Sequence, residues 1–291
     1  MFAKACSEAI KFTRPIVSLF RFDTGEVKAG IGSCIILNQD GWILTAAHVL
    51  AAAIKIQNDS IQRANYEKAV EQIESNRNIP RKTRQNMLRN LGPRGQWIKN
   101  YSFIFPGSTA QITGNSMIDL LADIGVARIS TLDGLDIKGF PTFPKMGQQI
   151  TPGTSLCTLG FPFHALEAKF DESSNQFKVD QLPTMVFFPS EGIHTRNVMI
   201  ADPDTKRQVP FIETSSPGLK GQSGGPIYDV DGKVWALQSR TAAYSLDIAP
   251  VIKENNKEFK EHQFIQVGMG CHTNHICDFL SQNKISFNLE S

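Results

Sequence analysis

The feature that most constrains the fold is a long series of short apolar runs separated by turn residues. The runs at 12–22 and 29–37 are rich in β-branched and aromatic residues and end near Thr24-Gly25 and Asp40-Gly41. Such runs are typical of antiparallel strands joined by tight turns. The pattern returns in shorter runs at 123–129, 155–159, 185–188, 197–200 and 234–237. Many short strands favour a mainly β barrel or sandwich over alternating βα units.

A polar, helical segment interrupts the β pattern. Asp59 or Ser60 is expected to begin a helix, and Pro80 suits the first turn of a second helix that ends at Gly92. We therefore predict a helical insertion at about 58–99. The charged segments 169–181 and 253–263 are expected to be loops or local helices, and Thr273 is expected to cap a final helix, about 273–283.

Composition excludes several classes of protein. A net charge of +2 predicts no strong overall attraction to nucleic acid or membrane. No apolar run approaches the ~20 residues that span a bilayer, and charges at Lys4, Glu8, Lys11 and Arg14 leave no core for a signal peptide. Five cysteines cannot all pair and show no framework spacing, so a cytoplasmic location is expected.

Three segments carry residues suited to acyl-transfer chemistry. His48 follows a hydrophobic run, Asp123 begins an alternating apolar run, and Ser223 lies within the glycine-rich stretch 221–226. A serine hydroxyl needs a nearby base, and a histidine can accept and return its proton. A carboxylate on the other ring nitrogen would fix the tautomer. The N–H groups of Gly221 and Ser223 are the expected oxyanion hole.

These segments, in this order, resemble the trypsin-like peptidase superfamily, and more closely its HtrA-like bacterial branch without PDZ domains. Further matches lie at 32–37, 159–162, 192–193, 213–214 and 267–274. The resemblance implies a chymotrypsin fold of two six-stranded antiparallel β-barrels, with the insertion in the first barrel and a C-terminal helix. Residues 1–135 would carry His48 and Asp123, and residues 136–291 would carry Ser223. It implies a serine endopeptidase that needs no cofactor and acts on peptide or protein substrates.

The chain departs from the family pattern in two places. Gln222 replaces the acid that zymogens of the family use to bind a new amino terminus, so any regulation is expected to act through loop ordering. The disulfide beside the catalytic histidine is missing. The resemblance implies that the pocket for the P1 residue, the residue before the scissile bond, is formed by Pro217, Leu237, Gln238, Ser239, Arg240, Thr241 and Met269. With Pro217 in place of an acid and Met269 at the pocket floor, we expect a small or medium apolar P1 residue.

Alternative interpretations remain open. Asp119 is a rival acid, although the strand pattern after Asp123 fits better. The glycines around Ser223 also satisfy the nucleophile elbow of α/β-hydrolases, but Pro226 and the apolar residues after it predict a strand where that elbow needs a helix. An esterase-like hydrolase, or a non-catalytic binding protein with a protease fold, would also be compatible with these residues.

Two further motifs can be interpreted as structural features or as functional sites. The tract from Cys271 to Cys277 contains two cysteines and two histidines, but strand and helix geometry would make them diverge, so a packed junction is favoured over a metal site. The basic stretch 77–99 contains seven Lys or Arg residues and no acid. A solvated helical face is the expected role, and docking of nucleic acid or an acidic partner is the less favoured alternative. The sequence leaves the oligomeric state open.

Overall fold

The computed structural model describes residues 1–92, 95–249, 251–254, 257–260 and 262–290. Its N-terminal half contains a six-stranded antiparallel sheet with the strand order β4-β1-β2-β3-β6-β5. The strands are β1 (Thr13–Phe22), β2 (Val27–Ile36), β3 (Trp42–Ala46), β4 (Ile98–Ile104), β5 (Ile112–Asp119) and β6 (Ile124–Ile129). Strands β4 and β5 are the two ends of this order, so the sheet is a half-barrel.

The C-terminal half contains a closed barrel with the strand order β11-β12-β17-β14-β13-β8. Its strands are β8 (Ser155–Gly160), β11 (Phe188–Ala201), β12 (Gln208–Thr214), β13 (Pro226–Tyr228), β14 (Val234–Ser245) and β17 (Phe264–His272). The two six-stranded antiparallel sheets confirm the predicted mainly β, chymotrypsin-like fold, although hydrogen bonds close only the second one into a barrel.

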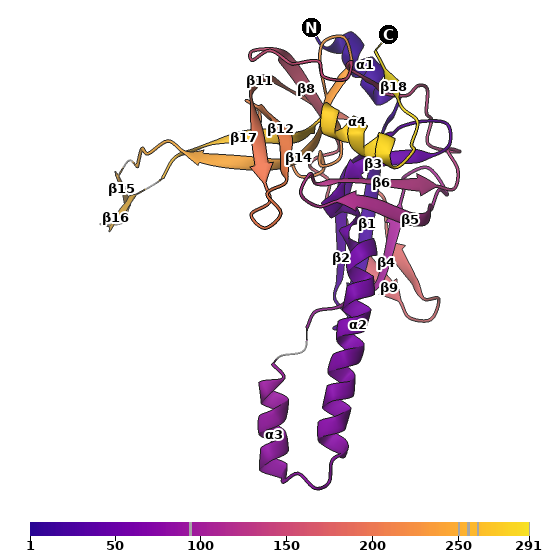
Figure 1. The fold of residues 1–291 in the computed structure, drawn as a ribbon, viewed down its shortest axis with the longest axis vertical. Coiled ribbons are helices and arrows are strands. Elements are labelled where there is room, and N and C mark those ends of the chain that lie inside the picture. Colours follow the sequence, from indigo (N-terminus) through magenta and orange to yellow (C-terminus); the bar gives the residue numbers. More distant parts are fainter. Residues whose placement is uncertain (93–94, 250, 255–256, 261, 291) are drawn as a thin grey trace.

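Smaller elements surround the two sheets. Helix α1 (Ala3–Ile10) precedes β1, and β7 (Thr142–Phe143) pairs in parallel with β18 (Asn288–Leu289). The hairpin of β9 (Ala168–Asp171) and β10 (Gln176–Val179) replaces the loop or helix expected at 169–181. Strands β14 and β17 extend as a ribbon toward β15 (Val251–Glu254) and β16 (Lys257–Lys260), so strands also occupy much of the segment expected to be a loop or helix at 253–263 (Figure 1).

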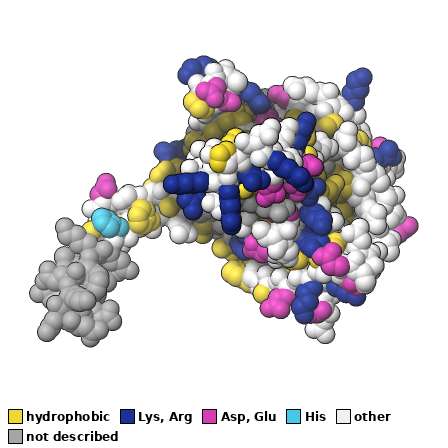
Figure 2. All heavy atoms as spheres, turned by 90° about the horizontal axis from the view of Figure 1, so that it is seen from below, with side chains coloured by type: hydrophobic (Ala, Val, Ile, Leu, Met, Phe, Trp, Pro, Cys, Tyr) yellow, Lys and Arg dark blue, Asp and Glu magenta, His cyan; other side chains and the backbone are white. Residues whose placement is uncertain are grey.

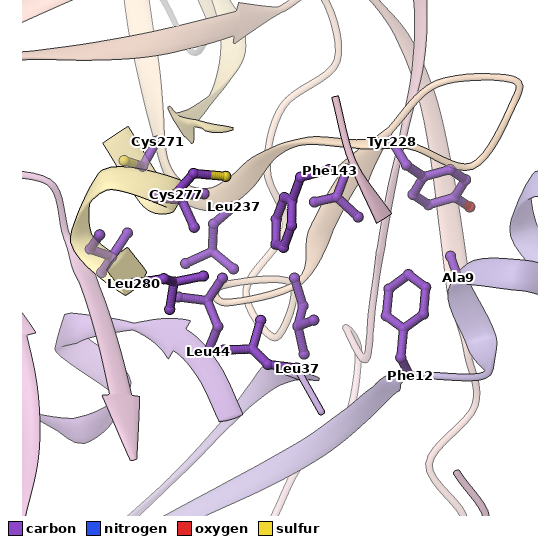
Figure 3. Close-up of a cluster of buried hydrophobic side chains, with 14 of the residues drawn as sticks. Ala9, Phe12, Leu37, Leu44, Phe143, Tyr228, Leu237, Cys271, Cys277 and Leu280 are labelled. Carbon is purple, nitrogen blue, oxygen red and sulfur yellow. The ribbon is translucent and has the colours of Figure 1, made fainter. Parts of the chain in front are cut away.

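One hydrophobic core joins the two sheets. Leu44 of β3 and Val126 of β6 belong to the same buried cluster as Leu159 of β8 and Leu237 of β14. Helix α4 (Thr273–Gln282) covers this cluster with Leu280 (Figure 3). The helix was expected to begin with Thr273 as its cap, but the capping side chain is that of His272, whose Nδ1 accepts a hydrogen bond from Asn274 N at 3.1 Å. The shared core fixes the two sheets against each other, and therefore fixes any site between them.

The helical insertion begins earlier than expected. Helix α2 runs for 29 residues over Ala47–Ser75, and helix α3 (Arg81–Asn90) returns beside it, so that the pair projects from the half-barrel (Figure 1). Alanine and leucine after position 46 favour a helix and leave no break before Asp59. Asp59 is therefore not a cap; it is buried, and its carboxylate binds Lys55 Nζ and Ile98 N.

The far end of this helical hairpin is basic. Figure 2 looks at the molecule from that end and shows Lys and Arg side chains gathered over it. The cationic residues of the α2–α3 turn and of α3 are Arg77, Arg81, Lys82, Arg84 and Arg89, and all but Arg84 are exposed. None of the described helices is long and apolar enough to cross a membrane.

Candidate active site

Strand pairing brings His48 and Asp123 together across 75 positions of sequence. Strand β3 pairs with β6 so that Ala46 lies opposite Ile124. His48 lies in the first turn of α2, directly after β3, and Asp123 directly precedes β6. The two side chains therefore leave adjacent strand ends on the same edge of the sheet.

The His48 ring and the Asp123 carboxylate form a short contact. His48 Nδ1 lies 2.9 Å from Asp123 Oδ2 and 3.1 Å from Oδ1. Because an ionised carboxylate only accepts hydrogen bonds, Nδ1 must carry the proton. The lone pair of the neutral imidazole is then on Nε2, and the side chain is about half exposed, at 51%. This is the tautomer that a general base requires.

Asp123 also completes the start of helix α2. Its Oδ1 accepts a hydrogen bond from His48 N at 3.0 Å, and its carbonyl oxygen accepts one from Ala47 N at 3.1 Å. Both N–H groups belong to the first turn, where no partner exists within the helix. Asp123 has a φ of +52°, a left-handed conformation that Asp tolerates better than most residues. The acid thus fixes the backbone of His48 as well as its ring.

Ser239 supplies a further hydrogen bond to this carboxylate. Its hydroxyl donates to Asp123 Oδ2 at 2.6 Å, and Ser239 itself is buried on β14 of the barrel. Burial raises the pKa of the Asp123 carboxyl, but the hydrogen bonds from His48 and Ser239 outweigh it, so the net pKa lies below the usual value. The carboxylate is therefore held in its ionised form by groups from both sheets.

The backbone of Ser223 lies against strands β2 and β3. Ser223 O accepts a hydrogen bond from Ser33 N at 2.8 Å. Gly224 has a φ of +85°, and a Cβ there would lie 2.1 Å from Ser33 O and 2.2 Å from Thr45 Oγ1. Only glycine allows this approach, which brings the serine turn of the barrel to the strand end that carries His48.

The Ser223 hydroxyl has a backbone partner on β14. It donates a long hydrogen bond of 3.5 Å to the carbonyl oxygen of Ser239. Among the hydrogen bonds of the described residues, none joins Ser223 to His48. Catalytic hydrogen bonds are often long before substrate binds, and rotation about Cα–Cβ is enough to redirect a hydroxyl.

The turn before Ser223 leaves two N–H groups without a protein partner. Gln222 N donates to Leu219 O at 2.9 Å, and Gly221, the third residue of this turn, has a φ of +102°. This positive φ is typical of a type II turn and sets the plane of the peptide between Lys220 and Gly221. If this peptide had the opposite orientation, Lys220 O could accept a hydrogen bond from Ser223 N. No hydrogen bond between these two described residues occurs. In the described part of the chain, the N–H groups of Gly221 and Ser223 bond to no protein acceptor.

Interactions from both sheets hold this turn in place. Ser33 Oγ donates to Gly221 O at 2.8 Å, and Phe161 N donates to the same oxygen at 3.2 Å. Gln222 is fully buried; its Oε1 accepts from Leu219 N at 2.9 Å, and its Nε2 donates to Phe188 O at 3.4 Å. Where zymogens of the family place an acid for a salt bridge, this chain thus has an amide that stabilises the turn internally.

The residues expected to form the P1 pocket separate into two groups. Leu237 and Met269 are buried in the core cluster. The side chain of Gln238 lies against Gly218: a Cβ on Gly218 would lie 2.1 Å from Gln238 Nε2, which donates to Arg240 O at 3.0 Å. Gln238 Oε1 has no hydrogen-bond partner among the described residues. The amide of Gln238 therefore fills the space beside Gly218.

The other expected pocket residues lie around this amide. Thr241 Oγ1 donates to Gly218 O at 2.7 Å, which connects β14 to the segment that contains Pro217. Arg240 is exposed, and its Nε donates to Ser239 Oγ at 3.2 Å. The structure thus brings β14 and the 217–218 segment together directly before the nucleophile turn.

Asp119, the rival acid, has different partners. Its Oδ2 accepts hydrogen bonds from Arg207 and from His275 Nε2, the latter at 2.9 Å, and its Oδ1 accepts from Ala122 N at 3.2 Å. Burial raises the pKa of Asp119, but the bonds from His275 and Arg207 outweigh it and hold the pKa far below the usual value. Asp119 therefore connects the turn before Asp123 to the barrel and α4, and it is Asp123 that contacts His48.

Sequence reasoning missed two supporting residues. Ser239 was expected only as part of a pocket wall, yet it binds the Asp123 carboxylate, and Ser33, which binds the nucleophile turn, was not singled out. Neither serine lies in a distinctive local pattern, because both act through contacts between distant strands. Ser239 is flanked by the polar residues Gln238 and Arg240, so nothing in the local sequence distinguishes it.

The described residues contain no group of three or more His, Cys, Asp or Glu side chains that could hold a metal ion. All five cysteines are free, and Cys271 and Cys277 are buried in the core cluster. His272 caps α4, whereas His275 contacts Asp119. The histidines and cysteines of this tract therefore have separate structural partners.

Comparison with known proteins places this site in a family. The trypsin-like peptidase domain family matches residues 32–237. The crystal structure of Rv3671c protease from M. tuberculosis in its active form is similar over 99% of this chain and 87% of that chain, with 11% identity and a TM-score of 0.51. The HtrA-type protease AlgW with a tripeptide is similar over 98% of this chain and 64% of that chain, with 14% identity and a TM-score of 0.49.

At these identities the structural likeness concerns the fold alone. No curated protein matches the sequence. The family match, however, covers well over half of the chain and includes His48, Asp123 and Ser223. The chain therefore belongs to the trypsin-like peptidase domain family and is a serine endopeptidase.

Proposed function

We propose that this enzyme cleaves peptide bonds through an acyl-enzyme intermediate, with Ser223 as nucleophile, His48 as general base and Asp123 as the group that orients the histidine. The observation that carries the proposal is the 2.9 Å contact between His48 Nδ1 and Asp123 Oδ2. It leaves the lone pair of Nε2 free beside a serine turn that touches the same strand ends. This arrangement supplies a base, and a means of stabilising its protonated form, in one place.

The proposed reaction begins when the Ser223 hydroxyl turns from Ser239 O toward His48 Nε2. His48 accepts the proton while Oγ attacks the substrate carbonyl, and the N–H groups of Gly221 and Ser223 stabilise the resulting oxyanion. His48 then donates the proton to the leaving amine, and the acyl group stays on Ser223 as an ester. Water, deprotonated by His48, hydrolyses that ester and restores the enzyme. No step needs a cofactor.

We propose a small or medium apolar P1 residue. The Gln238 amide is buried next to Gly218 and occupies space between β14 and the 217–218 segment, which leaves less room there for a substrate side chain. The hydrogen bond between Thr241 and Gly218 narrows it further. No carboxylate lies in this segment to attract a basic side chain. A peptide library should therefore show a preference for residues such as Ala or Val, and a strong preference for Arg or Lys would refute this proposal.

Two further proposals concern the surroundings of the enzyme. The cationic end of the helical hairpin is exposed, which supports a role in docking nucleic acid or an acidic partner as a second, less favoured function. The five free cysteines support a reducing, cytoplasmic compartment.

The proposed activity is tested by comparing wild type with Ser223→Ala and His48→Ala on casein and on a short ester. We expect wild type to cleave both, and both variants to lose activity by orders of magnitude. Cleavage of the ester without casein would indicate an esterase. Binding of protein without any turnover by folded wild type would indicate a non-catalytic binding protein and refute the proposal.

A further inference from the structure

Two pairs of phenylalanine rings lie beside the nucleophile turn, one buried and one exposed. Phe161 and Phe187 pack with ring centroids 4.9 Å apart, and Phe187 contacts the core. Phe163 and Phe188 meet edge to face at 5.2 Å, yet Phe163 is 76% exposed and Phe188 is 39% exposed. We call Phe163 and Phe188 the aromatic platform. Burying an aromatic ring is favourable, and rings that stay in water have not gained this free energy. An exposed pair of this kind is therefore typical of a binding surface.

The backbone that presents the platform is constrained rather than loose. Phe163 has a φ of +64°, a conformation that a bulky side chain rarely adopts. Neighbouring segments hold it there: His164 Nε2 accepts a hydrogen bond from Val186 N at 3.4 Å, which links the two segments that carry the platform. Phe187 directly precedes β11 and Phe188 is its first residue; Phe187 is partly buried against the core, whereas Phe188 is exposed.

The platform is connected directly to the oxyanion turn. Phe161 N donates to Gly221 O at 3.2 Å, and a Cβ on Gly221 would lie 2.3 Å from Phe161 O and 3.0 Å from Pro162 Cα. Phe188 O accepts a hydrogen bond from the side chain of Gln222 at 3.4 Å. Both attachments involve the residues directly before Ser223, so the segments that carry the platform contact the turn that would hold the scissile carbonyl.

The other side of the same turn belongs to the acyl half of a substrate. There Thr241 and Gln238 contact Gly218, where the proposed function places the P1 side chain. A peptide whose carbonyl occupies the oxyanion hole must continue past the turn on the opposite side. The segments that carry the aromatic platform are attached to the turn at Gly221 and Gln222, whereas the contacts proposed for the P1 side are at Gly218.

We propose that the aromatic platform binds an apolar or aromatic side chain of the substrate on the C-terminal side of the scissile bond. This inference rests on the proposed function, since it describes the leaving-group half of the same site. During cleavage the amine on the platform receives the proton from His48 and departs, while the acyl group remains on Ser223. By the reverse of that step, an amine held on the platform attacks the acyl-enzyme in competition with water.

Transfer of an acyl group from the enzyme to an added amine reports on the leaving-group half of the site alone. The enzyme is acetylated with p-nitrophenyl acetate, which carries no residue after the scissile bond, and phenylalanine amide or glycine amide is added as a competing acceptor. We expect phenylalanine amide to be acetylated about fivefold more efficiently than glycine amide, since an aromatic contact contributes about 1 kcal/mol. The ratio is measured within each variant, so that changes in overall activity cancel.

The double variant Phe163→Ala, Phe188→Ala should bring this ratio close to one. A matched control is Phe177→Ala, which removes a ring from another edge-to-face pair, with Phe170 at 5.0 Å on the β9–β10 hairpin; it should leave the ratio as in wild type. Replacing Phe163→Ala by Phe163→Leu in the double variant restores an apolar side chain, and it should recover part of the preference for phenylalanine amide over glycine amide. Release of p-nitrophenol with a wild-type ratio near one, or an unchanged ratio in the double variant, overturns the inference alone. Failure to form any acyl-enzyme overturns the proposed function and this inference with it.

Discussion

Removing the Ser239 hydroxyl tests how strongly the barrel supports Asp123, the proposed acid of the triad. In Ser239→Ala, Asp123 Oδ2 loses the 2.6 Å hydrogen bond and keeps the contact with His48 Nδ1. Hydrogen bonds to a charged group contribute about 1.5–3 kcal/mol, and a buried carboxylate cannot replace the lost donor with bulk water. We expect roughly half of that value, about 0.75–1.5 kcal/mol, to appear in the activation barrier, which corresponds to a decrease in kcat of about 4- to 13-fold. The remainder should lower the free energy of unfolding.

The assay compares kcat and KM for a short ester in wild type, Ser239→Ala and Ser245→Ala. Ser245 is exposed at the far end of β14, where its hydroxyl contacts only Asp247, so it is the matched serine control. We expect KM to stay within about twofold, because Ser239 acts through Asp123 and does not touch the leaving group. A Ser239→Ala enzyme with wild-type kcat would refute the reasoning that this hydrogen bond keeps the acid and the base in register.

Three further predictions concern other parts of the structure. Asp119→Asn should lower the free energy of unfolding by about 1–2 kcal/mol in urea, since Asp119 loses its charge while half-exposed Arg207 stays partly solvated. The pKa of Asp123 is lower in the folded than in the unfolded state, so it contributes stability above the ordinary Asp pKa of about 4; the stability advantage of wild type over Asp123→Asn at pH 6 should therefore shrink as pH falls below that value. The triple charge reversal Arg81→Glu, Lys82→Glu, Arg84→Glu should weaken low-salt binding to duplex DNA at least tenfold, as about three phosphate contacts are lost.

Each of these predictions has a control and a contradicting result. For Asp119, the matched change is Asp136→Asn at an exposed pair with Lys138, and equal stability of both variants would contradict the prediction. For Asp123, an advantage that stays constant from pH 6 to pH 3 would show that its pKa is not depressed. For the hairpin, the same charge change at Lys145, Lys169 and Lys206 should leave binding intact. Absence of DNA binding by wild type at low salt would rule out the docking role.

The positions of the main functional residues could be anticipated because each lies in a local pattern. His48 follows an apolar strand run, Asp123 precedes another, and Ser223 is surrounded by glycines that a tight backbone approach requires. The apolar runs and turn signals likewise predicted antiparallel strands in a barrel or sandwich, whereas the division into two six-stranded sheets was implied by the family resemblance. Such signals depend on residues close in sequence, and they can be read without knowing the fold.

The features that escaped prediction depend on contacts between distant segments. Alanine and leucine favour a helix from position 47, but the partners of its first N–H groups are the carbonyl and carboxylate oxygens of Asp123, which lies about 75 positions away and could not be identified locally. Charged residues suggested a loop or helix at 169–181, but Phe170 and Phe177 pair across a hairpin there. Tertiary contacts of this kind override local propensity, and nothing in the local sequence announces them.

The most direct test of the central claim is to locate the residue that a fluorophosphonate modifies. If an imidazole oriented by a carboxylate activates one hydroxyl beside two free N–H groups, the native protein should take up one probe per chain, and peptide mapping should find it on Ser223. Labelling should disappear in Ser223→Ala and after unfolding. Labelling of another serine, or a folded protein whose Ser223 stays unmodified at probe concentrations that saturate other serine peptidases, would contradict the account.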